Sequence, residues 1–278
     1  MAHHLAVFEF TSIGLRVTRT VPGSGSARSI IDPITEGAMR IYRLEWGALF
    51  AALALVFAVP HVASAASGTY YFKHFTTNGG SDTSWYTNDN SWGVNSADAN
   101  GFTVMVNGED WGTRSPVTTL PKRLSAVNPG NNSWFSQTSS PRPGAYYDAT
   151  YDIFIDPTAA PANRNSQNEL MIWLNWSNAQ PLSDRYDASG SAVPTRTNVS
   201  LGGRTWDIYT YSWPSGGHTI SYLDTRRSGW WSGSLSPFLN WGVSNGYYSS
   251  SQYLNSVMAG WEYGPGTYTA TSWGAVGF

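Results

Sequence analysis

Beyond residue 66, short runs of alternating apolar and polar residues recur along the chain, separated by Gly, Asn, Asp, Ser and Pro. Alternation with a period of two is typical of strands that bury one face, and frequent turn residues favour many short strands. The clearest runs span residues 68–75, 101–106, 147–156, 169–176, 204–213, 218–223, 253–263 and 267–276. The pattern predicts an all-β fold, either a sandwich or a jelly roll.

One segment departs from this alternation. Ser236 fits the N-cap of a helix, and Pro237 fits the first helical position. Leu239 and Val243 stand four residues apart, as on one face of a helix, and Gly246 is a suitable stop. We expect one short helix here, packed against the back of a sheet.

The N-terminal part of the chain resembles a leader. Met39 is followed by two arginines, a short apolar run and the small residues 63–65. This order is typical of a secretory signal peptide cleaved after Ala65, and the apolar run is shorter than the roughly 20 residues of a membrane span. An uncleaved signal anchor is the alternative. We therefore expect a secreted protein with an upstream extension or misassigned start over residues 1–38, a signal peptide over 39–65 and a single domain over 66–278.

Composition narrows the classes of function. Only 12% of residues are charged and 15% are aromatic, including 14 Trp and 16 Tyr, which suits a protein that binds carbohydrate. The net charge of -2, without a long Lys/Arg run, argues against nucleic acid or an anionic membrane as partner. Without cysteine there are no disulfides and no thiol catalysis. Past the leader only His74 and His218 remain, too few for a zinc enzyme, so we expect no metal and no cofactor.

The strongest functional signal lies at residues 168–176. Read as a strand, its leucines and isoleucine share one face, and Glu169, Met171 and Trp173 share the other. Packing of the apolar face therefore aims a carboxylate, a soft apolar side chain and a flat indole outward. These are groups that a site gripping a sugar chain would need.

Past the leader, only two other glutamates accompany Glu169. Glu109 lies in a turn-like polar run, and we interpret it as a solvated acid. Glu262 follows apolar residues that alternate inward, and Gly260 and Gly264 flank it on its own face. Two glycines beside a carboxylate leave room for a ligand to lie against it.

A third acid has a similar setting. In the run at residues 151–156 the apolar residues Tyr151, Ile153 and Ile155 take one face, so Asp152 points to the opposite side. If its strand joins that of Glu169 in one sheet, Asp152 can hydrogen-bond to Glu169 or share a proton with it. A purely structural role for Asp152 stays open.

Paired carboxylates fit glycoside hydrolysis, because its oxocarbenium-like transition state needs negative charge near the anomeric carbon and a proton for the leaving oxygen. The two acids must hold different protonation states at one pH, which a less solvated setting for one and hydrogen bonds to the other provide. The residues alone leave two possibilities: that Glu169 and Glu262 meet in space, or that they are edge acids that never meet.

Four places, in order, resemble the family 12 glycoside hydrolases, which are small β-1,4-endoglucanases. They are Asn-Asp-Asn-Ser-Trp-Gly at 88–93, Tyr-Asp-Ile-Phe at 151–154, Asn-Glu-Leu-Met-Ile-Trp at 168–173 and Gly-Trp-Glu at 260–262. The resemblance implies Glu169 as nucleophile, Glu262 as general acid/base and Asp152 as partner of the nucleophile. The implied reaction retains anomeric configuration, which requires carboxyl groups about 5–5.5 Å apart.

The resemblance also implies contacts to substrate. Trp92 and Trp173 would be sugar-stacking platforms, Asn90 a polar contact to a hydroxyl, and Met171 part of the cleft lining. The implied fold is a β-jelly roll of two antiparallel sheets, one of them curved into an open cleft. The chain departs from the family pattern at Trp261, where many members have Thr, and this puts the preferred polymer in doubt.

We therefore expect a secreted, monomeric, cofactor-free endoglucanase acting on β-1,4-glucan, whether cellulose-type, mixed-linkage glucan or xyloglucan. The alternatives are a non-catalytic carbohydrate-binding jelly roll and a xylanase of the sister family. Other tryptophans can extend a sugar platform, although core or surface packing is the more usual role of each one. They are Trp85, Trp111, Trp134, Trp206, Trp213, Trp230 and Trp231.

Overall fold

The computed structural model describes residues 10–11, 14–15, 68–160 and 168–278. The chain divides into two units, Met1–Arg43 and Leu44–Phe278. In the first unit, β1 (Phe10–Thr11) pairs with β2 (Gly14–Leu15). The signal peptide expected over residues 39–65 lies outside the described residues, as does most of the upstream extension. Everything below concerns the second unit.

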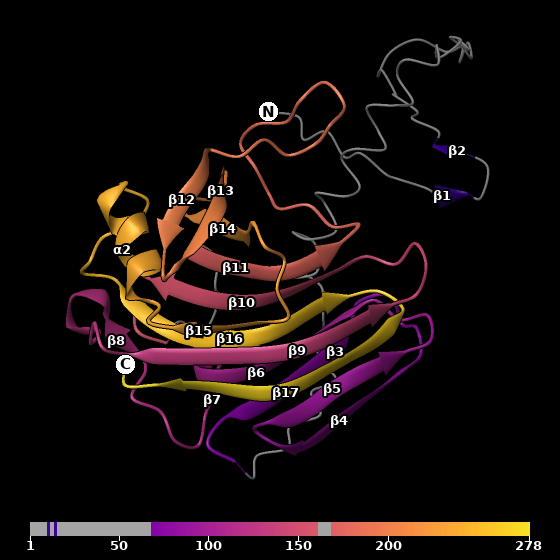
Figure 1. Cartoon of the computed structure of the whole chain (residues 1–278), viewed down its shortest axis with the longest axis horizontal. Coiled ribbons are helices and arrows are strands. Elements are labelled where there is room, and N and C mark those ends of the chain that lie inside the picture. Colours follow the sequence, from indigo (N-terminus) through magenta and orange to yellow (C-terminus); the bar gives the residue numbers. More distant parts are fainter. Residues whose placement is uncertain (1–9, 12–13, 16–67, 161–167) are drawn as a thin grey trace, which may run out of the picture. The chain divides into compact units, whose positions relative to one another are not determined.

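The larger sheet of the second unit has the strand order β12-β13-β14-β11-β10-β16-β6-β3, with β7 beside β6 and β8 beside β16 (Figure 1). Its strands are β3 (Tyr71–Thr76), β6 (Gly101–Asp110), β7 (Thr113–Arg114), β8 (Lys122–Arg123), β10 (Tyr147–Asp156), β11 (Asn168–Ser177), β12 (Arg196–Leu201), β13 (Arg204–Ser212), β14 (His218–Asp224) and β16 (Tyr253–Tyr263). Neighbouring strands are antiparallel except β11 and β14, which are parallel.

The smaller sheet has the order β15-β9-β17-β5-β4, and all its pairs are antiparallel. Its strands are β4 (Asp82–Asn88), β5 (Ser91–Ser96), β9 (Asn132–Pro141), β15 (Trp230–Gly233) and β17 (Gly266–Val276). The described helices are a 3₁₀ turn, η1 (Leu124–Ala126), and α2 (Ser236–Ser244). The predicted two-sheet sandwich is confirmed, with one parallel pair in the larger sheet.

The strands follow the sequence pattern closely where one face is apolar. All eight predicted runs form strands, and β10 and β16 have the predicted bounds. Strand β6 continues to Asp110, through the polar run that we interpreted as a turn. Glu109 is therefore a strand residue, and its carboxylate pairs with Arg114 across the β6–β7 hairpin at 3.5 Å.

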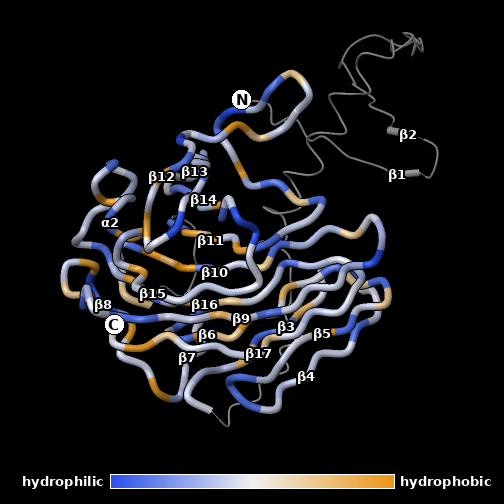
Figure 2. The backbone as a smooth tube through the Cα atoms, in the orientation of Figure 1, coloured by the Kyte–Doolittle hydropathy of each residue, from blue (hydrophilic) through white to orange (hydrophobic). Residues whose placement is uncertain are grey.

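The core fills the space between the two sheets. Tyr151 and Ile153 of β10 and Trp261 of β16 reach it from the larger sheet, and Phe135 and Trp273 reach it from the smaller one; all five are buried. Burial of one large apolar side chain stabilises a fold by about 1.5–3 kcal/mol. Figure 2 shows the hydrophobic colours concentrated on β10 and β11, at the centre of the larger sheet.

The expected helix is present as α2, although its start differs from the expectation. Its N-cap is Leu235, and Ser236 is inside the first turn, where its hydroxyl oxygen accepts a hydrogen bond of 2.7 Å from Asn131 Nδ2. Phe238 packs edge-on against Trp206 and Tyr222, which face the core. The helix thus closes one end of the core (Figure 1).

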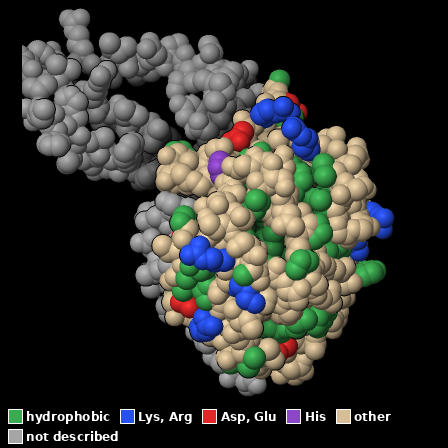
Figure 3. Space-filling view, turned by 90° about the vertical axis from the view of Figure 1, so that its left-hand side faces the viewer, with side chains coloured by type: hydrophobic (Ala, Val, Ile, Leu, Met, Phe, Trp, Pro, Cys, Tyr) green, Lys and Arg blue, Asp and Glu red, His purple; other side chains and the backbone are tan. Residues whose placement is uncertain are grey.

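Neutral residues dominate the surface that Figure 3 shows, with the charged side chains in a few small groups among them. Among the described residues, no helix combines the length and apolar character needed to cross a membrane.

Candidate active site

Strand β10 lies between β11 and β16 and aligns the acids of all three strands. Asp152 pairs with Met171 of β11 and Met258 of β16. Along β10, Tyr151 and Ile153 point into the core, so Asp152 points to the opposite face. Phe154, on that same face, pairs with Glu169, and Asp148, also on that face, pairs with Glu262.

The structure therefore brings the three predicted acids onto one surface, which we call the acidic face and define by Asp148, Asp152, Glu169 and Glu262. The two glutamates are paired with opposite ends of a seven-residue section of β10, from Asp148 to Phe154. On a flat strand that section is about 20 Å long. Figure 1 shows that the strands of this sheet are curved rather than flat. After burial and the charge of Asp148, the charge of Glu169 also raises the pKa of Glu262.

Glu262 has the electrostatic setting of a general acid. Burial, first, and then the neighbouring charges of Asp148 and Glu169 hold the pKa of its carboxyl well above the ordinary value. A carboxyl group in that setting keeps its proton at a pH where an exposed glutamate has lost it. Glu262 is thus equipped to donate a proton to a leaving oxygen.

Glu169 has a hydroxyl donor beside it. The parallel pairing of β11 and β14 places Thr219 opposite it, and Thr219 Oγ1 donates a hydrogen bond of 3.0 Å to Glu169 Oε2. Trp213 Nε1 in turn donates to Thr219 Oγ1 at 2.9 Å, which fixes the hydroxyl rotamer. A donated hydrogen bond stabilises a carboxylate anion, the form that a nucleophile needs.

Asp148 is a candidate site residue that our sequence analysis missed. It is only 2% exposed, and the backbone N–H of Glu262 donates to its carboxyl group. Burial, and then the charges of Asp152 and Glu169, raise its pKa well above the ordinary value. The signal was available, because Asp148 stands four residues before Asp152 in the same alternating run. Tyr146 also lies near these acids: burial and the charges of Glu262 and Asp148 raise the pKa of its hydroxyl.

Met171 and Trp173 lie on the acidic face, as the alternation predicts. Met171 is 7% exposed and Trp173 is 3% exposed, and both pack with Leu223 of β14. The ring of Trp176 lies against that of Trp173 with centroids 6.1 Å apart. Trp176 is the more exposed of the two indoles. Contact of Met171 and Trp173 with a sugar stays a prediction.

Trp92 and Asn90 are not on the acidic face, and we correct the role expected for Trp92. Its side chain is 0% exposed in the core between the sheets, where its ring packs edge-on against Trp261 and parallel to Phe135. A ring with no exposed face offers no platform for a sugar. Asn90 lies in the turn between β4 and β5, and its Oδ1 accepts a hydrogen bond of 3.1 Å from the backbone N–H of Trp273.

Gly260, which we expected to leave room for a ligand beside Glu262, instead has a structural role. A Cβ at this position would collide with the backbone oxygen of Thr103 on β6, so the glycine permits close approach of β16 and β6. It is not an opening for a ligand beside Glu262.

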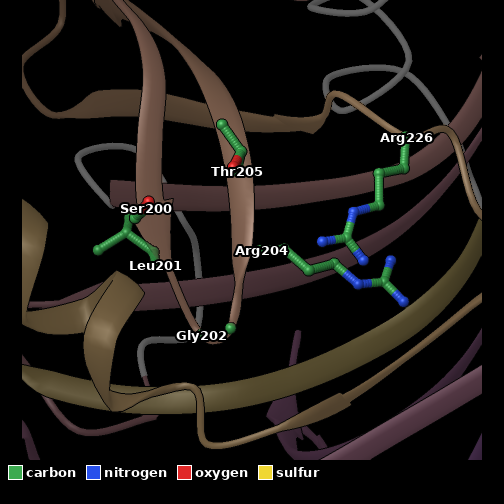
Figure 4. Close-up of a pocket in the computed structure, with 7 residues that line it drawn as sticks. Ser200, Leu201, Gly202, Arg204, Thr205 and Arg226 are labelled. Carbon is green, nitrogen blue, oxygen red and sulfur yellow. The ribbon is translucent and has the colours of Figure 1, made fainter.

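Within the described part of the chain, no group of three or more His, Asp or Glu side chains is arranged to hold a metal ion. Two cavities lie away from the acids. One sits at the β12–β13 hairpin and is lined by Ser200, Leu201, Gly202, Arg204 and Arg226, which Figure 4 labels. The other, between Trp134 and Trp230, is on the smaller sheet.

A β-sandwich whose larger sheet carries two glutamates and two aspartates on one face, one glutamate with a raised pKa and the other hydrogen-bonded, fits the class of the glycoside hydrolases. The model of glycosyl hydrolase family 12 matches residues 63–276, and the chain belongs to this family. The resemblance seen in the sequence is thereby confirmed.

The relatives differ in coverage and in their described activity. The chain is 34% identical over 142 residues to the xyloglucan-specific endo-β-1,4-glucanase A of Emericella nidulans, a match covering 50% of this chain and 54% of that protein. It is 32% identical over 117 residues to an inactive glycoside hydrolase of Phytophthora nicotianae, covering 41% of this chain and 44% of that one. The chain thus spans about half the length of the curated relatives it matches. A solved endo-1,4-β-glucanase, the cellulase CelB2, is 28% identical with a TM-score of 0.63, covering 77% of this chain and 96% of that chain.

Proposed function

We propose that the protein hydrolyses internal bonds of β-1,4-glucan with retention of anomeric configuration. One observation carries the proposal: Glu262 and Glu169 share a face of the larger sheet, and Glu262 has a raised pKa whereas Glu169 accepts a hydrogen bond from a hydroxyl group. Burial and neighbouring charge favour a proton on Glu262, and the hydroxyl of Thr219 favours the anion of Glu169. Acid and nucleophile of a retaining glycosidase need this division of states.

In the first step, Glu169 attacks the anomeric carbon while Glu262 passes its proton to the glycosidic oxygen, so the leaving chain departs as an alcohol. A covalent glycosyl ester on Glu169 results. Glu262, now ionised, then takes a proton from a water molecule as that water attacks the same carbon. The ester bond breaks, Glu169 becomes a carboxylate again, and the configuration after two inversions is the original one.

Asp152 and Asp148 support the two glutamates from β10. Asp152 stands on the acidic face, two residues from the partner of Glu169, and we assign it the positioning of the nucleophile. Asp148 is directly opposite Glu262, where its charge favours the protonated form of the general acid. Neither contacts the reacting carbon in this mechanism.

The relatives support a glucan backbone as substrate. The match in Emericella nidulans is named for xyloglucan, and the CelB2 structure for cellulase activity, so xyloglucan and cellulose derivatives are the first polymers to test. One relative is named as inactive, which means that membership of the family does not by itself imply catalysis. The acids are the stronger support for an enzyme over the non-catalytic binding alternative.

Secretion is also part of the proposal. It rests on the signal-peptide pattern at residues 39–65. Mass spectrometry of the mature protein should find Ala66 at its N-terminus, and a peptide from residues 1–38 in that sample would contradict the proposal.

The test compares wild type, Glu169→Gln and Glu109→Gln on xyloglucan, carboxymethylcellulose, mixed-linkage glucan and xylan. Glu109→Gln is the matched control, because it makes the same chemical change at the β6–β7 hairpin. We expect the control to keep its activity and Glu169→Gln to lose at least about a thousandfold in kcat. Viscosity should fall faster than reducing ends appear, as internal cleavage requires.

Full activity in Glu169→Gln would refute the mechanism. No hydrolysis by any of the three proteins, with retained binding to glucan, would favour the non-catalytic binding alternative. Preference for xylan would favour the xylanase alternative.

A further inference from the structure

The outer face of the smaller sheet carries a pair of tryptophans that the reaction does not use. Residues at even positions of β9 point outward, since Ser133 and Phe135 between them are buried. Trp134 is therefore on the outer face. Trp230 of β15 pairs with Ser136 of β9 and shares that face, while the next residue, Trp231, enters the core. The two indoles are diagonal neighbours on adjacent strands, at a typical separation of about 7–8 Å.

Both rings are held in place by the structure beneath them. The ring of Trp134 lies over Gly274 of β17, where a Cβ would collide with it. Trp230 is 57% exposed, and the guanidinium of Arg204 lies 5.2 Å from its ring centroid. Arg204 also donates a hydrogen bond of 2.6 Å to the backbone oxygen of Trp230 and pairs with the buried Asp224. Figure 4 shows Arg204 at the neighbouring hairpin. A fixed, exposed ring loses little entropy when a ligand stacks on it.

The space between the rings is hollowed and neutral. Ser136, Ser232 and Ser272 line it together with Trp134 and Trp230, around a volume of about 240 Å³. Hydroxyl groups offer both a donor and acceptors at each position. Indole faces with interleaved hydroxyls and no charged side chain in the lining match the surface of a neutral sugar chain, which alternates C–H faces with hydroxyl groups. The charge nearest to this lining is that of Arg204 beside Trp230, and it is already paired with the buried Asp224, so the surface favours a neutral ligand over a charged peptide or a nucleic acid.

We propose that this surface, which we name the Trp134–Trp230 surface and define by those two residues with Ser136, Ser232 and Ser272, binds a β-glucan chain as a second, non-catalytic site. The choice of β-glucan as ligand rests on the proposed function. The surface faces away from the smaller sheet's core side, whereas the acidic face belongs to the outer side of the larger sheet. A chain bound at the Trp134–Trp230 surface is not the chain being cleaved, so the surface holds the enzyme on an insoluble polymer.

Binding is measured without turnover, on the full-length protein carrying Glu169→Gln, by depletion from solution onto insoluble β-glucan. Trp230→Ala is compared with Trp111→Ala, a control of similar exposure, 47%, in the turn between β6 and β7. Loss of one stacking indole should weaken binding roughly three- to tenfold, and the control should not change it. Trp230→Phe keeps a ring and should restore most of the binding.

In the background with Glu169 intact, Trp230→Ala should keep its kcat/KM on a short soluble oligosaccharide and lose rate on insoluble glucan. Equal binding by Trp230→Ala and Trp111→Ala overturns the proposal. Equal loss of rate on soluble and insoluble substrates also overturns it. Failure of the proposed function is a separate result, since it appears as hydrolysis surviving in Glu169→Gln, whatever Trp230 does.

Discussion

Replacing Trp92 by alanine tests whether Trp92 is a core residue or a platform for the substrate. The structure places the indole of Trp92 in the core, 0% exposed, with its ring centroid 5.2 Å from that of Trp261 and 6.1 Å from that of Phe135. If Trp92 were a sugar platform, its truncation would weaken the affinity of the protein for substrate. If Trp92 is a core residue, its truncation lowers the free energy of unfolding.

The size of that loss follows from the burial. A buried indole removes roughly 150–250 Å² from water, which at about 25 cal/mol per Å² stabilises the fold by about 4–6 kcal/mol. Measured Trp→Ala changes in cores are about 3–5 kcal/mol, because neighbours relax partly into the cavity. For a domain of this size each kcal/mol shifts Tm by about 2–4 °C, so we expect Tm to fall by roughly 6–20 °C.

Thermal unfolding of wild type, Trp92→Ala and Trp111→Ala measures this directly. Trp111 is 47% exposed, so its truncation should change stability by no more than about 0.5 kcal/mol. KM for a soluble glucan, measured well below the Tm of each variant, completes the test. A Trp92→Ala variant with unchanged Tm and a tenfold higher KM would refute the core assignment and restore Trp92 as a sugar contact.

Two further predictions concern Glu262. Glu262→Ala should reduce turnover of glucan far more than turnover of aryl glycosides with good leaving groups, which need little protonation; equal losses on both would exclude Glu262 as the general acid. Asp148→Asn removes one of the negative charges that raise the pKa of Glu262, so that pKa falls and the alkaline limb of kcat/KM moves to lower pH. Because the raised pKa values of both carboxyls reduce stability as pH rises, this variant should also exceed wild type in Tm at alkaline pH and not at acidic pH. An unmoved pH profile would rule out Asp148 as a neighbour that sets the protonation of Glu262.

Strands were predictable where one face alone is apolar. In β10 the sequence Tyr-Asp-Ile-Phe-Ile-Asp predicts both the strand and the side of the strand on which Asp152 lies. Strand β9 was missed because it buries Ser133 and Gln137 beside Phe135, so its inward face does not read as apolar. Polar residues in a core need hydrogen-bond partners from other strands, and those partners appear only in the fold: Ser133 Oγ donates to the backbone oxygen of Gly274 at 2.8 Å.

The sequence likewise predicted one part of the candidate site and not the other. Alternation within a strand predicted that Glu169, Asp152 and Glu262 leave the core. Lateral neighbours depend on strand order and register, which local pattern does not contain. Thr219 reaches Glu169 only because β14 lies parallel beside β11, and Asp148 faces Glu262 only because β16 lies on the other side of β10.

Trp92 shows where a motif and a periodicity disagree. The motif suggested a sugar contact, yet Val94 two residues later is also apolar and buried, and the shared face of these two residues is the inward face of β5. Periodicity was the better guide, because it reports which side of a strand meets the core.

Trp92 can still influence the proposed catalytic residue Glu262, although it does not contact the substrate. Trp92 packs edge-on against Trp261, and the residue after Trp261 on β16 is Glu262, pointing the other way. Trp92 therefore lies behind Glu262, the proposed general acid, rather than in front of it. We expect a change at Trp92 to act on catalysis through the position of β16, lowering kcat before it raises KM.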